Sequence, residues 1–389
     1  MNESYSNTIR NDVRSVLMVF EKPGMFGYLS EEYLRAFYDN GWYVVVCFLC
    51  GNIDEKENGH HKFHEVITFG LSKKQVRGLK LRSIFYMLKL FSKRSFDLVI
   101  SHQNQANSSV GVALLFNKRI LSYAVFHGIN PLTAFDRKLF YNTIGRGFSR
   151  FIAVSDAQLQ NISKNCYCRS RDKFTVIRNP IDVEQMNLNV RSRQESRKIL
   201  DLGVNDFIFG TICRLTENKR PIDLIYALKE IETCLPGAKL LIIGEGSQRN
   251  KILSEALRLG LSEKIVMPGY IDKAWALIRG FDLFVLPSKF ESCSLVLLEA
   301  MMAKVPIIAS ESPGVQETLN GVGYLFEQGN FKEMAGYILT ISRMTKREKE
   351  RMVSVGFARV KSTFDNIIFQ KNILTLVEND LANLKSNDN

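Results

Sequence analysis

Short apolar runs alternate with longer amphipathic segments along the whole chain. A continuous apolar run is typical of a parallel strand that helices cover on both faces. In the first half this pattern predicts strands at 15–20, 42–49, 96–102, 120–127, 151–155 and 174–179, and helices at 29–40, 80–94, 105–116, 131–146 and 156–163. Ser30 is expected to cap the first helix and Gly41 to end it. The alternation indicates an α/β domain with a mostly parallel sheet.

The second half repeats this alternation. Strands are expected at 207–215, 239–246, 264–269, 283–288, 305–310 and 323–328. Two βαβ series in tandem predict an α/β protein with two doubly wound, Rossmann-like domains. The stretch 180–205 has no strand character and is the expected junction. We therefore divide the chain into residues 1–183 and 184–364, and expect a final helix, at about 365–389, to cross back onto the first domain.

Composition narrows the class of protein. The 389 residues are enough for two domains of ordinary size. No run of about 18 uncharged apolar residues occurs, so no membrane-spanning helix is predicted, and the polar N-terminus lacks the apolar segment of a secretory signal. The seven Cys lie scattered without the spacing of a zinc site, which favours free thiols in a reducing compartment. A cytoplasmic location is expected.

Positive charge is concentrated in the first half. The net charge is +12, and residues 71–150 hold 14 Lys/Arg against two acidic residues. In the segment 71–95, eight basic residues and no acidic one alternate with apolar positions. A basic amphipathic helix of this kind suits an anionic membrane surface, although its apolar face could instead pack on the sheet. No nucleic-acid-binding motif accompanies the charge, so nucleic acid is not an expected partner.

The segment 282–300 is the most informative part of the second half. Its sequence, DLFVLPSKFESCSLVLLEA, predicts a buried strand, a polar loop in which Ser292 and Ser294 can cap a helix, and a helix from Leu295 to Met302. This order places the first amides of a helix at the carboxyl end of a strand. Anionic ligands commonly bind at that position.

Cations and glycines follow two other strands of the second half. Arg214 and Lys219 come between a strand and a helix, where two charge-assisted contacts to a diphosphate would contribute about 1.5–3 kcal/mol each. Gly244 and Gly246 either let a ligand approach the backbone closely or form an ordinary tight turn. The third glycine of a dinucleotide fingerprint is missing there.

Two carboxylates, Glu291 and Glu299, raise the possibility of a two-acid hydrolase. Eight residues of helix would separate them by about 12 Å along the axis. This exceeds the roughly 5–9.5 Å between the paired acids of glycosidases. We therefore interpret the two acids as binding different parts of one elongated ligand. The turn at 312–317, SPGVQE, can shape the floor of the same site.

The second half resembles the donor domain of the retaining, nucleotide-sugar-dependent glycosyltransferases of the GT-B fold, especially glycosyltransferase family 4. The resemblance covers roughly 205–328 and rests on the segments ICRLTENKRPIDLIYAL, LLIIGEGSQR and VMPGYIDKAWALIRGFDLFVLPSKFESCSLVLLEAMMAKVPIIASESPGVQE. The most specific feature is the E-x7-E spacing of Glu291 and Glu299. Upstream, FIAVS and VIRNPID also fit the family. The resemblance implies two domains that face each other across a cleft.

The resemblance also implies roles for single residues. Arg214 and Lys219 would grip the donor diphosphate. Glu291 would lie by the transferred sugar, and Glu299 would bind the ribose hydroxyls of the nucleotide. Phosphate oxygens would be held by the backbone amides of Ser294, Leu295 and Val296.

The first half matches the family less closely. Members often have a Gly-Gly loop after the first strand, whereas Gly24 and Gly27 are separated here. Gly24 is the candidate for backbone contact with the leaving group. His127, in VFHGINPL, matches the family's histidine that reaches the donor sugar from the acceptor domain. Without the resemblance, a structural role for His127 is the alternative. His102 ends another strand and, with Asn104, could bind the acceptor.

The function that these features indicate is transfer of a hexose-like sugar from a nucleoside diphosphate to a glycan or lipid-linked acceptor. Cations and helix amides would stabilise the leaving group without a metal or other cofactor, in agreement with the lack of a D-x-D motif. The resemblance implies retention at the anomeric carbon and a role in surface polysaccharide or lipopolysaccharide synthesis, on the inner face of the cytoplasmic membrane. The alternatives are a sugar-nucleotide epimerase or hydrolase of the same fold, and a non-catalytic glycan-binding subunit.

Overall fold

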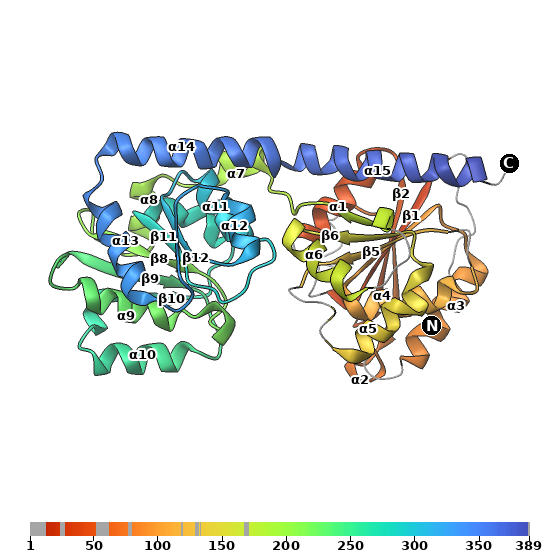
Figure 1. Cartoon of the computed structure of the whole chain (residues 1–389), viewed down its shortest axis with the longest axis horizontal. Helices are drawn as coiled ribbons and strands as arrows, with labels where there is room; N and C mark the ends of the chain where they lie inside the picture. The colour runs from red at the N-terminus through yellow and green to blue at the C-terminus, as the bar shows by residue number, and fades with distance from the viewer. Residues whose placement is uncertain are drawn as a thin grey trace. The chain divides into compact units, whose positions relative to one another are not determined.

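The computed structural model describes residues 13–23, 28–51, 62–76, 80–117, 120–128, 132, 134–166 and 171–387. The chain forms two compact units (Figure 1). Unit 1 comprises residues 1–178 and 369–389, and unit 2 comprises residues 179–368. The boundaries expected from the sequence, 183/184 and 364/365, lie a few residues from these.

Unit 1 is built on a parallel sheet. Within the described residues it has seven strands in the order β3 (Glu65–Leu71), β2 (Tyr43–Cys50), β1 (Ser15–Phe20), β4 (Leu98–His102), β5 (Leu121–Phe126), β6 (Arg150–Ala153) and β7 (Phe174–Val176). The sequence pattern predicts all of these except β3. Strand β3 is an edge strand that pairs in parallel with β2 only, and it alternates between buried and exposed side chains. It therefore lacks the continuous apolar run used to find the other strands.

Helices cover both faces of this sheet. They are α1 (Tyr28–Tyr38), α2 (Lys73–Val76), α3 (Leu81–Lys93), α4 (Gln103–Leu114), α5 (Phe135–Asn142) with the 3₁₀ turn η3 (Ile144–Gly147), α6 (Asp156–Asn165) and α15 (Asn366–Asn387). The expectation that Ser30 caps the first helix is wrong, because α1 starts at Tyr28 and Ser30 is buried inside it. Gly41 follows the helix with φ +79° and donates its N–H to the carbonyl of Tyr38 at 3.1 Å, as expected of a helix end.

The basic segment 71–95 is not one helix. Leu71 ends strand β3, α2 is a single short turn, and α3 begins only at Leu81. Lys80 has the left-handed φ of +54°, which a continuous right-handed helix does not allow. Residues 77–79, with Arg77 and Leu79, lie outside the described residues. The apolar positions are also divided: Met87, Leu90 and Phe91 are buried on the sheet, while Leu81 and Phe85 are exposed.

Unit 2 repeats the architecture with a six-stranded parallel sheet within the described residues. Its order is β10 (Ile265–Gly269), β9 (Ala238–Ile243), β8 (Phe207–Ile212), β11 (Leu283–Leu286), β12 (Ile307–Ser310) and β13 (Tyr324–Phe326). Consecutive strands run outward from β8 on one side and from β11 on the other. The strand order therefore reverses between β8 and β11, which are hydrogen-bonded neighbours. The crevice beside such a switch point is the usual ligand site of this architecture.

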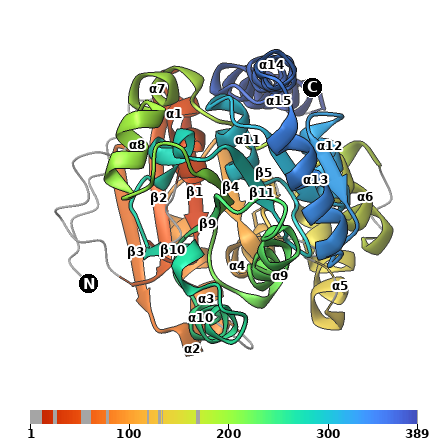
Figure 2. The ribbon, with the colours of Figure 1, turned by 90° about the vertical axis from the view of Figure 1, so that its left-hand side faces the viewer.

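Two helical layers enclose the sheet of unit 2. One face packs against α9 (Ile222–Ile231), α10 (Arg249–Arg258) and α13 (Phe331–Arg343). The other face packs against α7 (Val183–Asn189), α11 (Leu295–Met302), α12 (Pro313–Leu319) and α14 (Lys346–Thr363). Figures 1 and 2 both show α9 and α10 below the strands of this unit and α14 above them. The four inner strands, β9, β8, β11 and β12, are thus buried on both faces, as their sequences predict.

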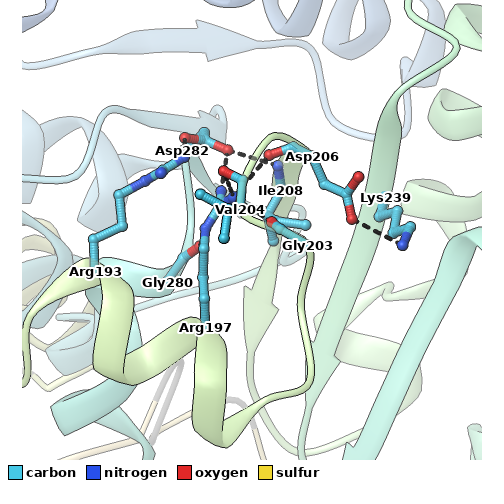
Figure 3. Close-up of polar contacts among 9 residues, drawn as sticks. All are labelled: Arg193, Arg197, Gly203, Val204, Asp206, Ile208, Lys239, Gly280 and Asp282. Carbon is cyan, nitrogen blue, oxygen red and sulfur yellow. Dashed lines mark hydrogen bonds and ion pairs between the residues drawn. The ribbon is translucent and has the colours of Figure 1, made fainter.

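A buried ion network ties the junction segment to the start of the sheet (Figure 3). Arg197, on α8 (Arg193–Ile199), is only 2% exposed and pairs through Nη2 with Asp282 Oδ2 at 2.6 Å. The same oxygen accepts the backbone N–H of Ile208 at 2.8 Å. Arg197 also donates to the carbonyls of Gly203 and Val204. These contacts gather at the amino ends of β8 and β11, opposite the edge at which ligands are expected.

The final helix packs on unit 1, as the sequence predicts. Phe369, Ile373 and Val377 of α15 are buried in the core beside the central strands. Tyr123 on β5 donates its hydroxyl to Asp380 Oδ2 at 2.8 Å, and Arg150 Nε donates to the same oxygen at 2.6 Å. The helix therefore adds both apolar burial and a hydrogen-bonded ion pair to the unit that begins the chain.

Candidate functional site

Two loops of unit 2 meet at the switch point between β8 and β11. The loop after β8 carries Arg214 and Lys219, and the loop after β11 carries Glu291. Lys219 Nζ lies 2.5 Å from Glu291 Oε1, and the Glu291 side chain is only 9% exposed. The structure thus brings together one predicted cation and one predicted carboxylate across the crevice. Each partly buried charge is compensated by the other.

Backbone contacts hold these two loops in register. The backbone N–H of Lys289 donates to the carbonyl of Asn218 at 2.7 Å, and the side-chain amide nitrogen Nδ2 of Asn218 donates to the carbonyl of Phe290 at 3.2 Å. Asn218 is adjacent to Lys219, so it fixes the position from which the lysine reaches Glu291. Asn218 was not predicted as a site residue, because no sequence pattern indicates that the loop after β8 contacts the loop after β11.

Arg214 has a different environment from Lys219. It lies two residues after the end of β8, is exposed, and within the described part of the chain makes no side-chain hydrogen bond or ion pair. The structure shows no contact between Arg214 and either carboxylate. Of the two predicted cations, Lys219 is therefore already paired, whereas the Arg214 guanidinium is available to an anion from solution.

The two glycines after β9 are explained by packing. A Cβ on Gly244 would lie 1.9 Å from the carbonyl oxygen of Cys213, and a Cβ on Gly246 would lie 2.4 Å from that of Leu215. Both contacts are with the loop that carries Arg214. Any larger residue at either position would push that loop away. The glycines therefore shape the site through its neighbouring loop, and direct contact with a ligand remains a prediction.

Helix α11 starts at Leu295 and ends at Met302, as the sequence predicts. Ser294 occupies the N-cap position, but the expectation that its hydroxyl caps the helix is wrong, since its side chain accepts no hydrogen bond from the helix. The amides of Leu295 and Val296 donate to no acceptor among the described residues. They are the orphan donors that every helix start leaves for a cap, water or ligand.

The separation of about 12 Å that we expect between Glu291 and Glu299 assumes a continuous helix, and that assumption is wrong. Glu291 lies in the loop four residues before α11, and only Glu299 is on the helix. The loop is held by α12, because a Cβ on Gly314 would lie 2.2 Å from the carbonyl oxygen of Glu291. The predicted contact between the SPGVQE turn and this site is therefore present.

Glu299 is a half-buried residue, and its carboxyl has no neutralising partner in the part of the chain that the structure describes. Among the described residues its side chain has no hydrogen bond or ion pair, and burial raises the pKa of its carboxyl to about 7. Desolvation favours the neutral form of an acid. Near neutral pH this group therefore exists in both states, and a ligand that donates hydrogen bonds to it would favour the ionised state.

A second candidate site lies in unit 1, at the carboxyl ends of β1, β4 and β5. A cavity of about 120 Å³ is lined by Phe20, Glu21, Leu29, Ser30, His102, Gln103 and His127. His127 Nε2 lies 2.9 Å from His102 Nδ1. Burial lowers the pKa of His127 to about 4, so its imidazole is neutral at neutral pH. The His127 side chain is half-buried at this cavity. Gly24 lies outside the described residues.

Two family models match this chain. Residues 30–185 match Glycosyltransferase Family 4, and residues 192–355 match Glycosyl transferases group 1. Together these segments account for most of the chain and for both units.

Single proteins with similar sequences carry related names. The chain is 25% identical over 248 residues to the UDP-Gal:alpha-D-GlcNAc-diphosphoundecaprenol alpha-1,3-galactosyltransferase of Escherichia coli, covering 60% of this chain and 62% of that protein. It is 25% identical over 303 residues to the capsular polysaccharide biosynthesis glycosyltransferase CapM of Staphylococcus aureus, covering 74% and 78%. The match thus spans about three fifths of the length of the first relative.

The fold also has solved counterparts. Anabaena Alr3699/HepE, crystallised with UDP-glucose, superposes with a TM-score of 0.77 over 94% of this chain and 99% of that one, at 21% identity. Sequence pattern, sheet topology and both family models agree. The chain belongs to the glycosyltransferases of the GT-B fold, with a family 4 segment at residues 30–185 and a group 1 segment at residues 192–355.

Proposed function

We propose that the chain is a glycosyltransferase that moves a sugar from a nucleoside diphosphate to a glycan or lipid-linked acceptor. The observation that carries this proposal is the arrangement at the switch point of unit 2. There Lys219 and Glu291 are in contact, Arg214 is unpaired among the described residues, and the first amides of α11 are open. The names of the relatives agree with this class of reaction.

The donor would bind to unit 2. Its diphosphate carries negative charge that grows on the leaving group as the sugar departs. Arg214, Lys219 and the amides at Ser294, Leu295 and Val296 offer positive charge and N–H donors for that group. We propose that these groups suffice without a metal ion. Glu299 would accept hydrogen bonds from the ribose hydroxyls, and Glu291 would lie by the transferred sugar.

The acceptor would bind to unit 1, in the cavity beside the two histidines. His127 is the proposed catalytic residue of this unit, and the neutral state of its imidazole suits it to exchanging hydrogen bonds with hydroxyl groups. We propose retention of the anomeric configuration, with the departing phosphate oxygen taking the proton of the acceptor hydroxyl.

The acceptor is proposed to be presented at an anionic membrane. Leu81, Phe85 and Phe116 are exposed by 68%, 62% and 76%, and a groove of about 620 Å³ between α3 and α4 includes Phe85, Lys89 and Phe116. Apolar side chains beside lysines are typical of surfaces that dock on anionic lipid. Within the described residues every helix is too short or too polar to span a bilayer. We therefore propose peripheral attachment on the cytoplasmic side, in surface polysaccharide or lipopolysaccharide synthesis.

A panel of sugar nucleotides with membrane lipid extract tests the reaction. Mass spectrometry should show one sugar added to one lipid-linked product, and NMR of the new bond should show the donor's anomeric configuration. Arg214→Ala should abolish product, whereas Arg258→Ala, on the exposed face of α10, should not. An epimerised or hydrolysed sugar nucleotide formed without acceptor would favour the rival reactions. A wild-type protein that binds glycan without any turnover would identify a non-catalytic subunit.

A further inference from the structure

His102 and His127 form a contact that the proposed reaction does not by itself require. His102 ends β4 and His127 follows β5, and these strands are neighbours in the sheet. Their rings are nearly parallel, at 15°, with Nδ1 of His102 2.9 Å from Nε2 of His127. Both rings line the same cavity.

The ring of His102 is held firmly. It is only 3% exposed and stacks on Phe20 with 4.5 Å between ring centroids and 9° between planes. The edge of Tyr33 packs against it at 4.9 Å. A ring fixed between two aromatic side chains has little freedom to rotate. The position of the His102 Nδ1 atom is therefore set by the core of unit 1.

The hydrogen bond restricts the protonation of both rings. Burial lowers the pKa of both imidazoles, so both are neutral at neutral pH and each carries one N–H. A hydrogen bond between Nδ1 of one ring and Nε2 of the other needs one bare nitrogen and one N–H. If His102 donates, both rings hold their hydrogen on Nδ1. If His127 donates, both hold it on Nε2. The two rings therefore always carry the same tautomer.

We propose that His102 is a positioning residue for His127: its hydrogen bond fixes the ring plane of His127 and couples the tautomer of His127 to its own, so that the state of His102 decides whether His127 Nδ1 donates or accepts a hydrogen bond. In catalytic sites the partner of one ring nitrogen commonly sets the state of the other. This inference rests on the proposed function for the part that His127 plays in transfer. The tautomer itself can be measured without any substrate.

The first experiment uses the full-length chain with ¹⁵N-labelled histidine at pH 7.5. The sequence contains five histidines, so long-range ¹H–¹⁵N spectra remain simple, and His102→Asn and His127→Asn assign the two signals. The proposal expects both rings to be neutral and to carry the same tautomer. Opposite tautomers, or a charged ring, would overturn it. This result does not depend on whether the chain transfers sugar.

The second experiment separates positioning from structural support. His102→Leu removes the hydrogen-bonding nitrogen, so the His127 signal should shift to a mixture of tautomers, and kcat should fall by at least about tenfold while the Kd for UDP changes less than about twofold. His102→Asn places an amide near the former Nδ1 and should restore much of kcat. Tyr33→Phe keeps the packing ring and is the control that should leave both readouts unchanged.

The outcomes of these variants are distinct. An unchanged His127 signal and an unchanged kcat in His102→Leu would overturn the proposal. Equal losses in His102→Asn and His102→Leu would assign His102 a packing role instead. Should His102→Leu fail to fold, the wild-type tautomers still decide the matter. A complete lack of transfer by the wild-type chain, with matched tautomers, would count against the proposed function and leave the histidine contact established.

Discussion

Lys219 and Glu291 lie 72 positions apart in the chain, yet their charged groups are 2.5 Å apart at the switch point of unit 2. A ligand that binds one of these two side chains must therefore weaken or rearrange its ion pair with the other. An incoming diphosphate would compete with the Glu291 carboxylate for the Lys219 ammonium. The ion pair therefore links two roles that the family resemblance assigns separately, contact with the diphosphate and contact with the sugar.

We expect Glu291→Gln to strengthen binding of a nucleoside diphosphate and to weaken transfer. The amide no longer competes with phosphate for Lys219, so the Kd for UDP should fall by roughly fivefold, as about 1 kcal/mol implies. Lys219→Met should raise the same Kd by roughly tenfold or more, because a charge-assisted contact is lost. Calorimetric titration with UDP measures both. Weaker UDP binding by Glu291→Gln would show that the carboxylate does not compete with phosphate.

The pH dependence of nucleotide binding should depend on Glu299. Its pKa is raised to about 7, so the protonated form predominates at pH 6 and the ionised form at pH 8. Ribose hydroxyls donate to the ionised form, and binding should therefore strengthen by about tenfold across this range. Titrations with UDP at pH 6 and 8 test this, with Glu299→Gln as the control that removes the Glu299 contribution. Identical pH profiles for the two proteins would contradict the assigned role.

The same raised pKa has a consequence for stability. The unfolded chain loses the Glu299 proton near the ordinary value of a glutamate, whereas the folded chain keeps it up to about pH 7. The folded state thus loses stability as pH rises between these values. Glu299→Gln should raise the melting temperature at pH 8 and change it little at pH 4. If Glu299→Gln raised the melting temperature equally at pH 4 and pH 8, the stabilisation would not come from the raised pKa of the buried Glu299 carboxyl.

Asp282 should be more important to unit 2 than its partly exposed position indicates. Asp282→Ala would leave the buried Arg197 cation without its carboxylate, which typically costs about 3–5 kcal/mol. Arg193→Ala removes the outer partner of the same carboxylate and should cost less than about 1 kcal/mol. Hydrogen exchange of the β8 amides under denaturant reports on this unit. Comparable losses in the two variants would mean that burial does not distinguish the two arginines.

Membrane attachment should depend on the exposed lysines of α2 and α3. Reversing Lys73, Lys74, Lys89 and Lys93 to Glu should abolish binding to vesicles with 30% anionic lipid, since each lysine contributes about 1 kcal/mol. Lys80 is left in place because it donates to Ser108 at 2.7 Å. The matched control reverses four exposed lysines of unit 2, at positions 251, 273, 332 and 346. Equal binding by both variants would remove the proposed lipid contact.

Much of the architecture follows from hydrophobic patterning alone. Buried parallel strands are continuous apolar runs, so the predicted strands are confirmed wherever both faces are covered, and helix α11 is predicted with its bounds. Strand β3 was not predicted, because it is partly exposed and its sequence is not a continuous apolar run. Lys80 and Ser30 show a second limit. A left-handed residue and a buried serine inside a helix result from tertiary packing, which local propensity does not record.

The candidate site was predicted as a set of residues but not as a set of contacts. Lys219, Glu291 and Glu299 are recognisable from their motif. The hydrogen bonds of Asn218, which align two loops, come from parts of the chain about 70 positions apart. The contact between His102 and His127 likewise depends on the pairing of β4 with β5. These contacts arise only when the sheet has folded, and the spacing of residues along one sequence does not predict them.

Helix α15 determines when the first unit can finish folding. Its buried residues Phe369, Ile373 and Val377 complete a core whose other buried side chains come from the first half of the chain, between Val16 and Ile177. During synthesis that core stays incomplete, and its apolar surface stays exposed to solvent, until all of unit 2 and then α15 have left the ribosome. The core of unit 2 is completed by Val360 and Phe364, which precede the buried residues of α15 in the chain, so unit 2 can fold first. Truncation of the chain after residue 368 should therefore yield a folded second unit and an aggregation-prone first one.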